Sequence, residues 1–126
     1  MKEKKVLIID DNTNFLLLLQ FYGENKKYKL YFESSAEAGY QRAEEIIPDL
    51  ILCDYVLGKV NGLEVCKRVR ENPKIRNCIF IMMTNKPITK EIEEEFHNLP
   101  DGWVSKSLGA EQIFNKIDKW LEIKQE

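Results

Sequence analysis

The stretch DLILCDYVLGKVNG, residues 49–62, joins a run of apolar residues to a carboxylate and then to a loop with two glycines. The apolar run, residues 50–53, is typical of a strand buried on both faces at the centre of a parallel sheet. Asp54 would then lie at the carboxyl end of that strand, the edge where open α/β sheets bind ligands. A carboxylate in that place can ligate a metal, act as a nucleophile or cap a helix.

Apolar runs and helical patterns alternate along the whole chain. The predicted strands are residues 5–9, 28–33, 50–54, 78–83 and 102–105. The predicted helices run from Asn12 or Thr13 to about Asn25, from Ser34 or Ser35 to Pro48, and over residues 61–71, 90–98 and 109–124. This alternation predicts an α/β fold, a doubly wound five-stranded parallel sheet with helices on both faces.

The composition fits one domain over residues 1–126. Of the 126 residues, 44% are hydrophobic and 32% are charged, which argues against a disordered chain. The formal net charge of −2 gives no sign of nucleic-acid binding. No apolar run is long enough for membrane insertion or for a signal peptide, so we expect a cytoplasmic protein. The three cysteines lack metal-type spacing and fall in apolar patterns, which favours free buried thiols.

Polar side chains stand at the ends of four predicted strands. Asp10 and Asp11 follow the first strand, Asp54 ends the third, Thr84 follows the fourth and Lys106 follows the fifth. Because the carboxyl ends of parallel strands share one edge, we expect these residues to converge. Three carboxylates repel one another unless a cation lies among them, and a site of this kind suits Mg²⁺. With a hydroxyl and an ammonium to hold phosphoryl oxygens, the set predicts an aspartyl-phosphate site.

The same ordered set resembles the receiver domain of bacterial and archaeal response regulators. Five residues agree with that family in type and order, with spacings of 30 residues from Asp54 to Thr84 and 22 from Thr84 to Lys106. The resemblance covers essentially the whole chain. It implies a flavodoxin-like sheet with the strand order 2-1-3-4-5. It also implies a signalling switch that catalyses only its own phosphorylation and dephosphorylation, rather than an enzyme.

The resemblance implies a role for each matching acidic position. Asp54 would be the phosphoacceptor of a two-component phosphorelay. Asp11 would bind Mg²⁺ directly, and Asp10 would do so largely through water. Asp54 and the backbone carbonyl of Val56 would complete the metal site.

Further roles follow from the same resemblance. Thr84 would contact the phosphoryl group and shift on phosphorylation, Lys106 would pair with that group, and Trp103 takes the place of the aromatic switch residue. The phosphoryl group would come from a histidine kinase or a histidine phosphotransfer protein. An unidentified downstream protein would read the change on the surface of the fourth helix, fifth strand and fifth helix.

Several positions depart from the usual pattern of that family. Gly58 stands where a proline is usual, which predicts a more mobile loop. Ser107 follows Lys106 in place of a proline, so no cis peptide bond is expected there. Trp103 is larger than the usual Tyr or Phe, which argues against free rotation of this switch residue. Val56 cannot orient an attacking water, which predicts slow autodephosphorylation.

The first helix has more apolar residues than one buried face needs. A spacing of three and four would turn Phe15, Leu18, Leu19 and Tyr22 inward and leave Leu16, Leu17 and Phe21 outward. An exposed apolar patch of this kind is typical of a partner-binding surface. In the family that the chain resembles, this helix often docks the phosphohistidine domain of the kinase.

Three other functions remain open. A phosphorylation-independent adaptor would fit the departures at Gly58, Trp103 and Ser107, although the intact acids, Thr84 and Lys106 argue against it. A phosphatase or phosphotransferase with an aspartate nucleophile would normally carry a second carboxylate two residues after that nucleophile, where this chain has a valine. A flavin-binding role is disfavoured because the first loop lacks a hydroxyl-rich phosphate cradle.

Overall fold

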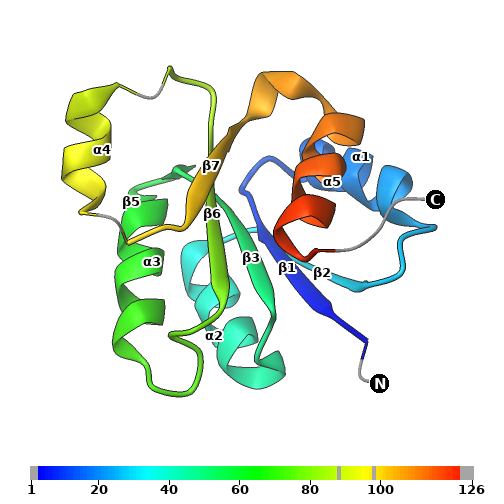
Figure 1. Ribbon diagram of the computed structural model, residues 1–126, viewed down its shortest axis with the longest axis horizontal. Coiled ribbons are helices and arrows are strands. Elements are labelled where there is room, and N and C mark those ends of the chain that lie inside the picture. Colours follow the sequence, from blue (N-terminus) through cyan, green and yellow to red (C-terminus); the bar gives the residue numbers. More distant parts are fainter. Residues whose placement is uncertain (1–2, 88, 98, 123–126) are drawn as a thin grey trace.

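The computed structural model describes residues 3–87, 89–97 and 99–122, with only the backbone of Phe96. Its central element is a sheet of parallel strands in the order β2-β1-β3-β6-β7 (Figure 1). These strands are β1 Lys5–Ile9, β2 Lys29–Glu33, β3 Leu50–Asp54, β6 Ile79–Thr84 and β7 Gly102–Ser105. If only these five strands are numbered, one to five along the chain, their order in the sheet is the expected 2-1-3-4-5. The predicted α/β fold is therefore confirmed.

Helices cover both faces of the sheet (Figure 1). The two helices on one face are α1 (Thr13–Gly23) and α5 (Ala110–Trp120), and those on the other are α2 (Ala36–Ile46) and α3 (Gly62–Glu71). A short helix, α4 (Lys90–Phe96), precedes β7, and a 3-10 turn, η1 (Lys106–Leu108), joins β7 to α5. Within the described ranges, no helix has the length and apolar character needed to cross a membrane.

Side-chain caps begin the first four helices. The N-cap residues Asn12, Ser35, Asn61 and Thr89 each accept a hydrogen bond from the backbone N–H three residues further on. Such caps satisfy donors that the first helical turn leaves without a partner. Of the cap candidates in the sequence, Asn12 and Ser35 are therefore the ones used.

The observed boundaries lie close to the predicted ones. All five strands agree with the prediction to within one residue at each end. α1 ends at Gly23 rather than Asn25, and α2 ends at Ile46, since Pro48 cannot continue the helix. The helix ends predicted at Asn98 and Lys124 lie outside the described residues.

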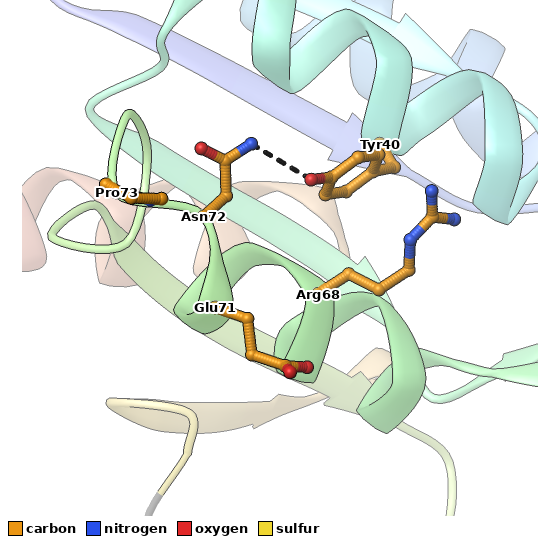
Figure 2. A pocket seen from close by; sticks show the side chains of 5 residues that line it. All are labelled: Tyr40, Arg68, Glu71, Asn72 and Pro73. Atoms are coloured by element: carbon orange, nitrogen blue, oxygen red, sulfur yellow. Dashed lines mark hydrogen bonds between the residues drawn. The ribbon is translucent and has the colours of Figure 1, made fainter.

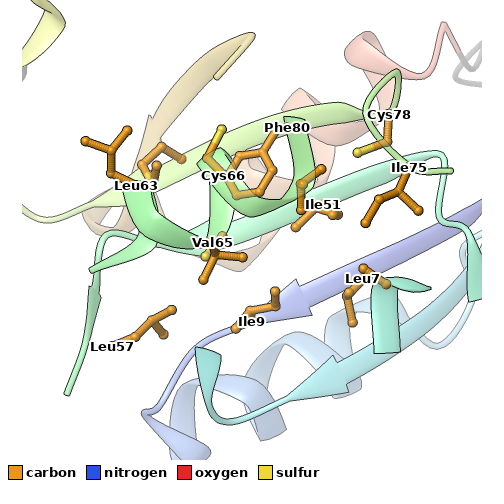
Figure 3. Close-up of a cluster of buried hydrophobic side chains, with 14 of the residues drawn as sticks. Leu7, Ile9, Ile51, Leu57, Leu63, Val65, Cys66, Ile75, Cys78 and Phe80 are labelled. Atoms are coloured by element: carbon orange, nitrogen blue, oxygen red, sulfur yellow. The ribbon is translucent and has the colours of Figure 1, made fainter. Parts of the chain in front are cut away.

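Alternate side chains of the central strands form two buried clusters. One lies under α2 and α3 and includes Leu7, Ile9, Ile51, Cys53, Phe80 and Met82 (Figure 3). The other lies under α1 and α5 and includes Val6, Ile8, Leu50, Leu52, Ile81 and Met83. The continuous apolar runs thus correspond to strands buried on both faces, as predicted. All three cysteines are free and buried, which also agrees with the prediction.

A small hairpin replaces the loop that was predicted after Asp54. β4 (Val56–Leu57) pairs in antiparallel fashion with β5 (Val60–Asn61). Gly58 occupies the turn with a φ of 69°, a conformation that glycine adopts without steric cost. Two-residue strands are too short to produce a periodic pattern, so the sequence carried no signal for them.

The orientation of α1 differs from the prediction at three residues. Leu16 is buried, so its predicted outward position is wrong. Leu18 and Tyr22 are exposed, so their predicted inward positions are wrong as well. The exposed apolar residues, which we call the α1 patch, are Leu17, Leu18, Phe21 and Tyr22, with exposed fractions of 60%, 43%, 69% and 49%.

The buried side of α1 consists of Leu16, Leu19 and Gly23. Gly23 allows a close approach to the sheet and to α5, because a β carbon there would collide with Leu30 and Phe114. A helix with apolar residues on two sides offers two alternative buried stripes at the same spacing. Only the tertiary packing decides between them.

Candidate functional site

The order of the strands brings the predicted polar residues to one edge of the sheet. Asp10 directly follows β1, Asp54 ends β3, Thr84 ends β6 and Lys106 directly follows β7. These strands are consecutive neighbours in the sheet. The predicted convergence is therefore confirmed for the acids and the lysine, whose side chains meet as described below.

Three carboxylates form an acidic cluster at this edge. One side-chain oxygen from each of Asp10, Asp11 and Asp54 lies within 4.8 Å of the others. Asp10 is fully buried and Asp54 is 6% exposed, whereas Asp11 is open to solvent. Buried and adjacent carboxylates are a ligand set that a hard divalent cation binds through oxygen. The donor set therefore fits a metal ion with one solvent-facing side.

Lys106 lies between the two buried carboxylates. Its ammonium nitrogen is 2.8 Å from Oδ2 of Asp10 and 3.2 Å from Oδ2 of Asp54. The side chain is only 12% exposed. Burial by itself lowers the pKa of Lys106, but the contacts with Asp10 and Asp54 outweigh it, and the pKa is raised. The lysine is thus held as a cation beside the acids.

Burial and a neighbouring carboxylate make Asp54 easier to protonate than an ordinary aspartate. Burial and then the charge of Asp10 raise the pKa of the Asp54 carboxyl from 3.8 to about 6, although Lys106 opposes the change. The negative charge on Asp54 is thus only partly compensated by the groups of the protein. A cation bound among the three acids would stabilise the ionised, nucleophilic form.

Hydrogen bonds from backbone N–H groups orient the carboxylates of Asp10 and Asp54. Oδ1 of Asp10 accepts a hydrogen bond from the backbone N–H of Asn12 at 2.9 Å. Oδ1 of Asp54 accepts one from the backbone N–H of Val56 at 3.4 Å. Val56 is 55% exposed, and its side chain brings no polar group to the loop after Asp54. Whether its carbonyl would ligate a metal stays a prediction.

The other two predicted residues, Thr84 and Trp103, lie on β6 and β7, the strands beyond β3. Thr84 is buried, and its Oγ1 accepts a hydrogen bond from the backbone N–H of Lys86 at 3.1 Å. Trp103 on β7 is half-buried and packs against the hydrophobic cluster under α2 and α3. The peptide bond between Lys106 and Ser107 is trans, as predicted.

Two residues of the site were not recognised in the sequence. The ring of Phe15 lies 4.8 Å from the ammonium of Lys106, although its helical spacing predicted only a core role. Gly62 lies against the backbone carbonyl of Asp54, although the sequence places it only where the loop passes into the helix of residues 61–71. Phe15 and Lys106 are far apart in the sequence, whereas Gly62 and Asp54 lie close together in it, and neither contact has a local signal.

A separate surface hollow lies between α2 and α3 (Figure 2). Its lining residues are Tyr40, Arg68, Glu71, Asn72 and Pro73. Asn72 donates a hydrogen bond to the Tyr40 hydroxyl at 2.9 Å, and the Arg68 guanidinium lies 3.9 Å from the Tyr40 ring. Arg68 also forms an ion pair with Glu37 outside the hollow at 2.9 Å, and the hollow shares no residue with the acidic cluster.

Comparison with known proteins agrees with this arrangement. A family model described as the response regulator receiver domain matches residues 6–118. The chain belongs to this family. Receiver domains of this kind are parts of two-component response regulators and serve as signalling switches.

Two curated proteins similar to this receiver domain are named as regulators: one is a transcriptional regulatory protein and the other a response regulator. The alkaline phosphatase synthesis transcriptional regulatory protein PhoP of Bacillus subtilis (strain 168) is 35% identical over 113 residues, which cover 90% of this chain and 42% of that protein. The response regulator ArlR of Staphylococcus saprophyticus is 27% identical, with 93% of this chain and 52% of that protein covered. This chain thus spans about half the length of these relatives.

Solved structures show the same fold. A CheY-like response regulator receiver domain from Methanospirillum hungatei JF-1 matches with a TM-score of 0.84 at 23% identity, covering 96% of this receiver domain and 95% of that chain. The receiver domain of a repressor protein from Vibrio parahaemolyticus matches with a TM-score of 0.85 at 19% identity, covering 96% and 92%. At these identities the similarity concerns the fold alone.

Proposed function

We propose that residues 1–126 act as one receiver domain that accepts a phosphoryl group on Asp54 from a histidine kinase or a histidine phosphotransfer protein. The observation that carries the proposal is the grouping of a buried Asp54 with two further carboxylates and the Lys106 ammonium. A nucleophilic carboxylate needs a cation beside it that also accepts the charge of the incoming phosphoryl oxygens. Lys106 meets that need from within the chain.

The proposed transfer is an in-line displacement at phosphorus. A carboxylate oxygen of Asp54 forms the new P–O bond while the P–N bond of the donor phosphohistidine breaks. The imidazole leaves with the electron pair. With acetyl phosphate as donor, a P–O bond breaks instead and acetate leaves. The product in both reactions is an acyl phosphate, whose charge Lys106 would partly neutralise.

Mg²⁺ is the metal that we propose for the acidic cluster. Asp10, Asp11 and Asp54 would hold it, together with the backbone carbonyl of Val56. When bound, it would neutralise the oxygens of the transferred phosphoryl group. The solvent-facing side at Asp11 leaves room for the waters that Mg²⁺ retains in protein sites.

Phosphorylation would change the surface that a downstream protein reads. Thr84 ends β6 beside β3, and its hydroxyl would turn toward the new phosphoryl oxygens. Trp103 lies on β7, next to β6, and would respond to that movement. The surface of α4, β7 and α5 would then carry the signal to an unidentified protein in the cytoplasm.

The α1 patch is the proposed docking surface for the phosphodonor protein. Leu17 and Phe21 keep the role given to them by the sequence, whereas the buried Leu16 does not. A Leu17→Glu, Phe21→Glu double variant should slow transfer from the phosphodonor protein and leave transfer from acetyl phosphate unchanged. Ile47→Glu is the matched control, because Ile47 is exposed and lies outside the patch. Equal transfer from the protein donor to both variants would refute this docking surface.

Intact-mass measurement tests the proposed function. After incubation with acetyl phosphate and Mg²⁺, the wild-type chain should gain one phosphoryl group. The Asp54→Asn variant should gain none, and neither should wild type in excess chelator. An adduct on both proteins would place the chemistry elsewhere. No adduct on wild type would favour the adaptor function instead.

A further inference from the structure

We propose that Phe15 is a positioning residue, which holds the Lys106 ammonium at the point where it contacts both buried carboxylates. The ammonium lies 4.8 Å from the centre of the Phe15 ring. That distance is within the range at which the negative face of an aromatic ring attracts a cation. The inference rests on the proposed phosphoryl transfer to Asp54.

Phe15 completes a closed loop of contacts around the site. Asp10 Oδ1 accepts a hydrogen bond from the backbone N–H of Asn12 at 2.9 Å, and Asn12 Oδ1 accepts one from the backbone N–H of Phe15 at 3.1 Å. The Phe15 ring then lies against the Lys106 ammonium, which returns to Asp10 Oδ2 at 2.8 Å. The start of α1 and the lysine after β7 are therefore held in one geometry.

The lysine needs such a support because its side chain is long and flexible. Lysine has an unbranched stem of four carbons, and its ammonium can reach a carboxylate from many rotamers. The ammonium contacts one carboxylate oxygen of Asp10 and one of Asp54, and it also lies over the Phe15 ring. These neighbours leave the Lys106 side chain only 12% exposed to water. The ammonium is then in place before the phosphoryl group arrives. This lowers the activation barrier of the transfer and leaves the affinity for the donor unchanged.

Phe15 also packs against the hydrophobic cluster under α1 and α5, so the test must separate packing from positioning. Phe15→Leu keeps an apolar side chain and removes the ring. Phe15→Tyr keeps the ring. Phe32→Leu is the matched control, since it removes an aromatic ring that is also partly buried and packs against the same cluster.

The first measurement is independent of phosphorylation. In the NMR spectrum of the wild-type protein, the ε-methylene protons of Lys106 should be shifted upfield by the ring current of Phe15. The shift should persist in Phe15→Tyr and Phe32→Leu and vanish in Phe15→Leu. A Lys106 resonance at an ordinary position in wild type would overturn the proposal, whether or not Asp54 is phosphorylated.

The second measurement is the rate of phosphorylation by acetyl phosphate at saturating Mg²⁺. Phe15→Leu should lower the maximal rate by about tenfold, the factor that corresponds to about 1.4 kcal/mol. The acetyl phosphate concentration for half-maximal rate should not change, and Phe15→Tyr should recover most of the rate. A folded Phe15→Leu variant that reacts at the wild-type rate would overturn the proposal. If the wild type takes no phosphoryl group, the proposed function is refuted. The NMR measurement would then still show whether the Phe15 ring lies against Lys106.

Discussion

Gly62 lies in contact with the backbone carbonyl of Asp54, so closely that a β carbon at Gly62 would collide with that carbonyl oxygen. The same β carbon would be 2.8 Å from Sδ of Met82, inside normal van der Waals separation. Gly62 also donates a backbone hydrogen bond to the carbonyl of Tyr55 at 2.6 Å. The first residue of α3 is thus packed directly against the end of the strand that carries Asp54.

Gly62→Ala should therefore destabilise the protein and displace Asp54. Forcing one extra carbon into a packed site costs about 1–3 kcal/mol, and denaturant unfolding would measure the loss. Gly58→Asn is the control, because Gly58 has open space around it and asparagine tolerates its positive φ. If Gly62→Ala were as stable as Gly58→Asn, the close contact at Asp54 would not exist.

Asp54→Asn should make the metal-free protein more stable at pH 7. The folded-state pKa of Asp54 is raised from 3.8 to about 6, so between these values the folded protein binds more protons than the unfolded chain. Wild-type stability then falls as pH rises through this window, by about 2–3 kcal/mol, whereas asparagine has no charge to bury. Unfolding curves of both proteins at pH 4 and pH 7 would measure the difference. A gap that is equal at both pH values would contradict the assignment.

Mg²⁺ should stabilise the wild-type protein against unfolding. A ligand at ten times its dissociation constant adds about 1.4 kcal/mol to the free energy of unfolding when it binds only the folded state. Thermal unfolding with MgCl₂, compared with NaCl at equal ionic strength, measures the effect. Asp11→Asn should remove the Mg²⁺ effect, and because Asp11 is exposed, its loss should alter the metal-free stability little. A full Mg²⁺ effect in Asp11→Asn would exclude Asp11 as a ligand.

The phosphorylated protein should lose its phosphoryl group slowly. Val56 is exposed beside Asp54 and carries no group that could orient a water for attack. Val56→Asn would supply such a group, and we expect hydrolysis to become faster by about tenfold. The decay of the phosphorylated mass after removal of acetyl phosphate measures both rates. A wild-type half-life of seconds would contradict this prediction.

The sequence carried enough information for the sheet and for the acidic site. Continuous apolar runs located the strands, and the parallel order then required Asp10, Asp54 and Lys106 to share one edge. These inferences depend on local patterns combined with a general rule of topology. The ion pairs of Lys106 with both aspartates agree with them.

Other features depend on tertiary contacts that leave no local pattern. α1 has apolar residues on two sides, and the packing at Gly23 decides that Leu16 is buried and Leu18 is exposed. The hairpin around Gly58 is too short for periodicity. The placement of Phe15 beside Lys106 joins residues from opposite ends of the chain. None of these could be inferred from spacing in the sequence.

The most direct test of the account locates the phosphoryl group on the chain. Borohydride reduces an acyl phosphate to an alcohol, so an aspartyl phosphate becomes homoserine, which peptide mass spectrometry can identify. After treatment with acetyl phosphate and Mg²⁺, we predict reduction at Asp54 alone. Reduction at a different acidic residue, or none in protein fully exposed to donor and metal, would contradict the assignment of Asp54 as the phosphoacceptor.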